Sequence, residues 1–312
     1  MTTYYALEIQ SFPNGEICER YEIGVFQTRL EAEETAKRYL SEIPGFKDYY
    51  CEYTIHESAL IGTSEEVYNF TGWDRDDEGN EINIYVSPLY ADRRSAEQAM
   101  DRAQSEMPRQ EWCMNDWSVG KCEWSEGFTR EYPDGSIAPT LAELRENLQA
   151  LSASRSVCGI EFEYSDHAQY YFPVAVGEGL FLSAVDDDFM LNGFTVRRLR
   201  DIFDLDSRKG IYQTIAEKEG LTDFVAPDVD ITNWQTVFAS LQKHGRHIIV
   251  EREYEPDFFR LGVIESVGEA HVIFRHYDAD GIWQEPRKIN YREITSVTFD
   301  DRYANTFSKY LS

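Results

Sequence analysis

Two stretches of the chain, residues 32–44 and 96–108, carry the same pattern at an offset of 64 positions. Both open with Ala-Glu and close with Ser-Glu-x-Pro. The correspondence continues outside the two stretches, since Tyr4 falls on Tyr68 at the same offset. Self-similarity at a fixed period marks a repeated folding unit. The sequence therefore predicts a tandem repeat in the N-terminal half.

Each repeat is predicted to be a ββαβ unit. In the first repeat, Thr28 and Glu31 have the spacing of a capping box, which opens a helix that Pro44 ends. Residues 4–10 mix aromatic and apolar residues in a short extended pattern, and residues 19–26 and 50–57 alternate apolar and polar residues as strands do. In the second repeat, Asp92 is the predicted helix cap. The predicted boundaries are residues 1–62 for repeat 1 and 63–128 for repeat 2.

The remaining chain shows a weaker internal similarity. Thr140 and Glu143 form a second capping box, which places a helix in a predicted connector over residues 129–155. Beyond it, Asp186 falls on Asp278 at an offset near 92. The predicted modules are a β-rich repeat over 156–220, a helical linker over 221–245 and a second β-rich repeat over 246–312.

The last module has the clearest strand pattern. It has a strand with Leu261 and Gly262, a hairpin with an acidic turn at 278–281, and a final apolar strand reached through Glu293 and Ile294. This pattern resembles an Sm-like barrel in miniature, and the resemblance implies small barrels whose closure removes exposed strand edges. The predicted fold class is thus α+β: tandem ββαβ repeats, a helical connector, and two small Sm-like β-barrel-type repeats.

Charge restricts the partners that this chain can attract. Asp and Glu number 57 against 30 Lys and Arg, which gives a formal net charge of −27. Such a chain gains little from counterion release on phosphate, so nucleic acid and anionic membranes are disfavoured. A basic protein partner is favoured instead. Acidity is equally typical of an ordinary soluble surface, and that interpretation stays open.

Cysteine usage and the N-terminus indicate the compartment. The five cysteines are odd in number and include no CxxC pair, which favours a reducing environment. The first residues, MTTYYALEIQ, lack a basic segment followed by an apolar one, and no apolar run approaches transmembrane length. We therefore expect a cytoplasmic protein.

No motif in the sequence predicts catalysis. GxSxG, HExxH, Walker-type and GxGxxG patterns are absent from it. His244 and His247 span a predicted helix end, where their side chains diverge and would not chelate a metal. The Asp-x-Asp-Gly string at 278–281 lacks the remaining ligands of a calcium loop. We expect a protein that is not an enzyme and that uses no cofactor or metal.

Acidic clusters at predicted turns are the remaining candidates for partner binding. The ordinary explanation is that Asp suits turns, and docking against a basic surface is the alternative. The candidate partner-binding residues are Asp74, Asp76, Asp77, Glu78, Asp186, Asp187, Asp188, Asp278 and Asp280.

Strong acidity, repeated small α+β modules without a catalytic set, and cytosolic cysteine usage occur together here. In kind, these features resemble the immunity proteins that bacteria pair with polymorphic toxins. The resemblance implies stoichiometric inhibition of a basic toxin, with carboxylates against Lys and Arg and aromatic residues as hot spots. One alternative is a regulatory or scaffolding module with Sm-like domains, for which RNA binding would depend on Arg197 and Arg200. The other is an anti-defence protein that mimics nucleic acid.

Overall fold

The computed structural model describes residues 1–12, 19–60, 63–76, 79, 81–132, 135–208, 210–255 and 257–311. The protein is of the mixed α+β class, with antiparallel strands in open sheets. The described chain divides into two compact units, of which the first ends at Arg130 and the second begins at Glu131. No helix among the described residues is long and apolar enough to cross a membrane.

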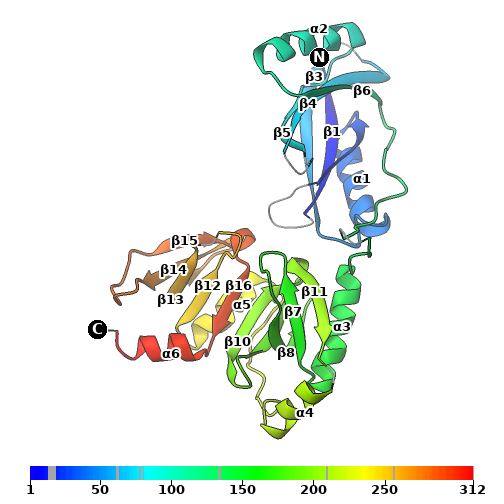
Figure 1. Ribbon diagram of the computed structural model, residues 1–312. Coiled ribbons are helices and arrows are strands. Elements are labelled where there is room, and N and C mark those ends of the chain that lie inside the picture. Colours follow the sequence, from blue (N-terminus) through cyan, green and yellow to red (C-terminus); the bar gives the residue numbers. More distant parts are fainter. Residues whose placement is uncertain are drawn as a thin grey trace. The chain divides into compact units, whose positions relative to one another are not determined.

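The first unit contains two three-stranded antiparallel sheets, with strand orders β2-β1-β3 and β5-β4-β6. Helix α1 packs on the first sheet and α2 on the second, as Figure 1 shows. The elements in chain order are β1 (Thr2–Ser11), β2 (Glu19–Phe26), α1 (Arg29–Glu42), β3 (Cys51–Leu60), β4 (Glu66–Arg75), β5 (Glu81–Val86), α2 (Arg93–Glu106) and β6 (Glu111–Ser118).

Helix α1 begins at the predicted capping box. The Thr28 hydroxyl accepts the Glu31 N–H at 3.2 Å, and the Glu31 carboxylate accepts the Thr28 N–H at 3.1 Å. Ala32, Ala36 and Tyr39 recur at helical spacing and are buried against β1 and β2. The face of this sheet toward α1 is therefore apolar. Because successive side chains of a strand point to opposite faces, every second residue of β1 and β2 lies on the face away from α1.

The opposite faces of the two sheets are joined at one end by an apolar cluster, which includes Tyr4, Val25, Val67 and Leu89. Beyond β6 the chain returns to the first sheet. The Gly120 N–H donates to the carbonyl oxygen of Val25 at 2.8 Å. Two residues earlier on β2, the carbonyl oxygen of Ile23 accepts the Glu123 N–H at 2.8 Å. The two sheets are thus tied together at this end.

The second unit is built on one antiparallel sheet of ten described strands, in the order β11-β7-β8-β9-β10-β16-β12-β13-β14-β15. Its elements in chain order are α3 (Leu141–Ser154), β7 (Cys158–Phe162), β8 (Gln169–Val176), β9 (Leu180–Asp186), β10 (Leu191–Arg198), η1 (Leu199–Asp201), β11 (Ile202–Ser207), α4 (Ile211–Lys218), α5 (Trp234–Lys243), β12 (Ile248–Glu251), β13 (Phe259–Val267), β14 (His271–Tyr277), β15 (Arg287–Asn290), η2 (Tyr291–Glu293), β16 (Ser296–Phe299) and α6 (Arg302–Ser308).

The prediction of two small barrels is wrong in one respect, because no closed barrel is present in the described part of the chain. Strand β10 pairs with β16, with Val196 opposite Val297, so the strands of both predicted barrels form a single open sheet. Gly193 permits this approach, since a Cβ there would lie 2.6 Å from the Phe299 carbonyl oxygen. The junction satisfies two strand edges by pairing, which is an alternative to closure.

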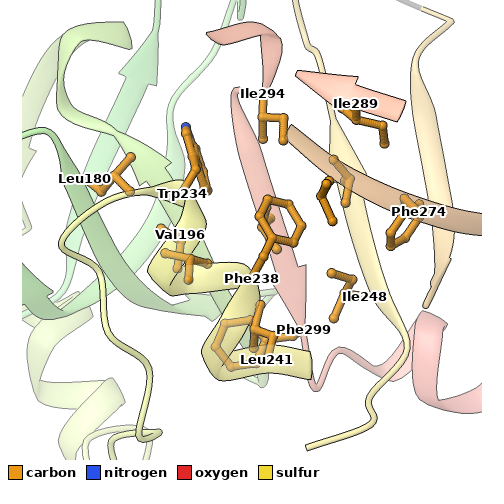
Figure 2. Packing of buried hydrophobic residues seen from close by; sticks show 14 of the residues in the cluster. Leu180, Val196, Trp234, Phe238, Leu241, Ile248, Phe274, Ile289, Ile294 and Phe299 are labelled. Carbon is orange, nitrogen blue, oxygen red and sulfur yellow. The ribbon is translucent and has the colours of Figure 1, made fainter. Parts of the chain in front are cut away.

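A continuous apolar core crosses this junction. Helix α5 contributes Phe238, which is fully buried among side chains from both halves of the sheet (Figure 2). Leu180 and Val196 come from β9 and β10, whereas Ile248 and Phe299 come from β12 and β16. Helix α3, in the predicted connector, packs elsewhere on the sheet through buried leucines.

Candidate functional site

The inner faces of the two sheets in the first unit line a polar site that is open to solvent. A cavity of about 820 Å³ and a smaller one of about 300 Å³ lie there. Both are lined by the same five residues: Glu8, Arg20, Glu22, Val86 and Trp117. The inner faces of packed sheets are normally apolar, so the two carboxylates mark this region as unusual.

Glu8 and Glu22 are directly opposite one another on β1 and β2. The register shifts between Leu7 and Glu8, so that β2 has one residue more than β1 at this point. Such a bulge re-aims side chains, and here Glu22 comes to line the same cavities as Glu8. Like charges directly opposite in a sheet are destabilising. The pair is therefore a local cost to folding that some other interaction must offset.

The charge of this pair is only partly neutralised within the chain. Glu8 is 6% exposed and accepts a hydrogen bond from the Gln10 amide at 2.5 Å. The Arg20 guanidinium lies 3.9 Å from the other Glu8 oxygen, which is too long for a hydrogen bond. Burial raises the pKa of Glu22, the Glu8 carboxylate raises it further, and Arg20 lowers it. Among the described residues, Arg20 is thus the cation that acts on both carboxylates, and it is not hydrogen-bonded to Glu8.

Aromatic residues and further carboxylates complete the larger cavity. Its tryptophans are Trp73, Trp117 and Trp124, and its other acidic residues are Glu81, Glu123 and Glu126. The Trp117 indole N–H donates to the Asn69 side-chain oxygen at 2.8 Å, which fixes the ring. Five carboxylates and one guanidinium line this cavity, so its potential is negative and is focused by the low-dielectric walls. Chemically, the arrangement suits a cationic group.

Replacing Glu22 with glutamine is expected to stabilise the first unit by about 1 kcal/mol at neutral pH, because it removes the like-charge pair. The folded-state pKa of Glu22 is raised, so the folded state binds the proton more readily than the unfolded state does. Its destabilising effect is absent below the unfolded-state pKa and develops as the pH rises toward the folded-state pKa. The gain from Glu22→Gln should therefore shrink in acid.

Thermal unfolding followed by circular dichroism, from about pH 4 to about pH 8, measures this gain. Glu34→Gln is the matched control, because Glu34 is exposed on α1 and carries the same charge change. A Glu22→Gln protein no more stable than the wild type at neutral pH would show that the pair carries no strain.

The acidic residues predicted from the sequence lie elsewhere, and several of them are hydrogen-bonded within the chain. Asp74 accepts hydrogen bonds from the Gln110 N–H at 3.1 Å and the Asn83 amide at 3.0 Å. Asp76 accepts the Gly79 N–H through its backbone carbonyl. Asp77 and Glu78 lie outside the described residues.

The candidates of the second unit occupy two separate turns. Asp186 is 7% exposed and accepts the Tyr212 hydroxyl at 2.9 Å, while burial raises its pKa. Asp187 and Asp188 are exposed in the same turn. Asp278 accepts the N–H groups of Asp280 and Ile282, at 3.0 and 2.9 Å. Strands β16, β12 and β13 separate β10 from β14 in the sheet, so the two turns do not form one acidic site.

The basic residues on which RNA binding would depend are mostly inaccessible. Arg197 is 5% exposed and Arg198 is 7% exposed. Arg197 pairs with Glu253 at 2.9 Å and Arg198 with Asp201 at 2.5 Å. The Arg200 side chain is 24% exposed and lies 3.9 Å from Asp201. These arginines belong to the interior ion-pair network of the second unit.

Sequence reasoning missed Glu8, Glu22 and the tryptophans of the cavity. The available signal was Glu8 as the one charged residue of the largely apolar and aromatic segment 4–10. Among the described residues, no group of three or more His, Cys, Asp or Glu side chains could hold a metal ion. Comparison with protein-family models, curated proteins and solved structures finds no match to this chain.

Proposed function

We propose that this chain is an acidic, non-enzymatic inhibitor of the bacterial immunity-protein type, which neutralises a basic toxin in the cytoplasm by stoichiometric binding. The observation that carries the proposal is the inter-sheet cavity of the first unit, with five carboxylates, one guanidinium and three tryptophans. Tryptophan is enriched among binding hot spots, and carboxylates select a basic partner. The net charge of −27 favours rapid encounter with such a partner.

We further propose that both units arose by duplication of smaller modules. The sheet orders β2-β1-β3 and β5-β4-β6 support this for the ββαβ repeats of the first unit. In the second unit, the orders β11-β7-β8-β9-β10 and β16-β12-β13-β14-β15 place corresponding strands in corresponding positions. The short helices η1 and η2 precede the last strand of each set. The Sm-like resemblance would then apply to the strand pattern of each module, without closure.

Co-purification with the product of the gene immediately upstream tests the proposed function. We expect an equimolar complex that protects cells from that product. Its affinity should fall at least about tenfold when salt rises from about 50 mM to about 500 mM, because the attraction is between exposed charges. Glu8→Gln and Glu22→Gln should weaken the complex, whereas Glu34→Gln should not.

Absence of both protection and a complex would overturn the immunity proposal. A complex that forms with a nucleic-acid-binding defence protein instead, and competes with DNA, would favour the nucleic-acid mimic. A complex with a non-toxic partner that depends on the second unit would favour a regulatory or scaffolding module.

A further inference from the structure

We propose that Glu8 and Glu22 form a subsite for a guanidinium group, so that an arginine side chain enters between the two sheets of the first unit. The inference deepens the proposed function and rests on it, because the arginine would belong to the basic partner. The site is the cavity of about 300 Å³ together with the larger cavity that adjoins the same carboxylates.

A bound cation would remove the cost that this pair imposes on the free protein. The two carboxylates are direct cross-strand neighbours, so their Cβ atoms are roughly 5 Å apart. Each carboxylate can accept several hydrogen bonds, and the nearest guanidinium of the chain is 3.9 Å from Glu8. Within the described part of the chain, acceptor capacity therefore remains at a negatively charged position where Glu8 is buried and Glu22 is half-buried.

Guanidinium fits this position better than ammonium does. Its five donors lie in one plane and can bridge two carboxylates, whereas ammonium is compact and more strongly hydrated. Trp117 lines both cavities, and a guanidinium can stack on an indole face. Ala6, Val25 and Leu89 supply apolar walls in the smaller cavity, against which the methylene stem of an arginine can pack.

The larger cavity provides the approach to this pair. Its other carboxylates are those of Glu81, Glu123 and Glu126. Glu81 is 3.7 Å from Arg75 and Glu123 is 3.3 Å from Lys121, and all four of these side chains are at least 41% exposed. Exposed ion pairs are weak, so these residues can attract a cation without retaining it. Discrimination between cations is left to Glu8 and Glu22.

Titration of the full-length protein with blocked Gly-Gly-X-Gly-Gly peptides tests the subsite, where X is arginine, lysine or citrulline. The indole N–H resonances of Trp73, Trp117 and Trp124 report binding by NMR. We expect the arginine peptide to bind at least about tenfold more tightly than the lysine peptide, and the uncharged citrulline peptide to cause no saturable shift. Glu8→Gln and Glu22→Gln should each weaken arginine binding about tenfold or more.

Glu34→Gln should leave arginine binding unchanged, and circular dichroism establishes that each variant is folded. Equal affinity for the arginine and lysine peptides would overturn the inference. Arginine binding that survives both Glu8→Gln and Glu22→Gln would also overturn it. In either case the salt-sensitive complex with the upstream gene product can still form, so the subsite can fail while the proposed function stands. Loss of that complex with intact arginine binding would instead reject the proposed function.

Discussion

Replacing Glu253 with alanine should lower the free energy of unfolding of the second unit by about 3–5 kcal/mol, because it leaves a buried cation without its partner. Arg197 is 5% exposed, and its Nη1 atom donates to both Glu253 oxygens at 3.0 and 2.9 Å. The guanidinium also donates to the Tyr164 hydroxyl and lies 4.6 Å from the Phe162 ring centroid. Since β10 carries Arg197 and the segment after β12 carries Glu253, the pair joins the two halves of the sheet.

Urea-dependent hydrogen exchange of peptides from β10 and β12 measures this loss in the full-length protein. Asp206→Ala is the control, because its ion pair with Arg208 is at 3.4 Å between side chains that are 56% and 40% exposed. That change should cost less than about 0.5 kcal/mol. The double replacement Arg197→Met with Glu253→Leu should recover most of the stability, since it removes both charges. Equal losses in Glu253→Ala and Asp206→Ala would contradict this account.

Replacing Phe238 with alanine should also cost about 3–5 kcal/mol, because it removes a fully buried ring and leaves a cavity. The ring of Phe238 lies in the cluster that contains Leu180 and Val196 as well as Ile248 and Phe299 (Figure 2). We therefore expect both halves of the sheet to lose protection together. The same exchange experiment, on peptides from β9 and β13, measures this coupling.

Phe259→Ala is the control for the core replacement, because Phe259 is 43% exposed and its loss leaves a smaller cavity. A smaller loss of stability is expected for it. If Phe238→Ala weakened β12 to β16 and left β7 to β11 unchanged, the two halves of the sheet would be independent folding units.

Helix starts are the part of this fold that the sequence predicts well. The capping boxes at Thr28 and Thr140 and the cap at Asp92 are confirmed, because each depends on residues within one turn. A helix is also present within the predicted helical linker, over Trp234–Lys243. Strand segments were also predicted from alternation, which is a local property.

Pairing between distant strands could not be predicted in this way. Val196 pairs with Val297, and local alternation gives no register between segments so far apart in the chain. The candidate site could not be predicted for the same reason. Glu8 and Glu22 occupy the positions where a two-layer sheet and helix would expose polar residues to water, and residues of the second sheet line the same cavities as they do. The aspartates at turns could be predicted because turns have local sequence signatures.

The β10–β16 ladder has a consequence for how the second unit could be divided. The chain between α4 and α5 is a covalent tether that keeps the two strand sets at high effective concentration, and it also packs on them through Leu221, Val229 and Ile231. A nick in that tether would leave the ladder, the Arg197–Glu253 pair and the cluster around Phe238 in place. Two separately synthesised fragments divided between α4 and α5 would therefore carry the complementary strand edges of β10 and β16. Each fragment would be the template on which the other completes its fold.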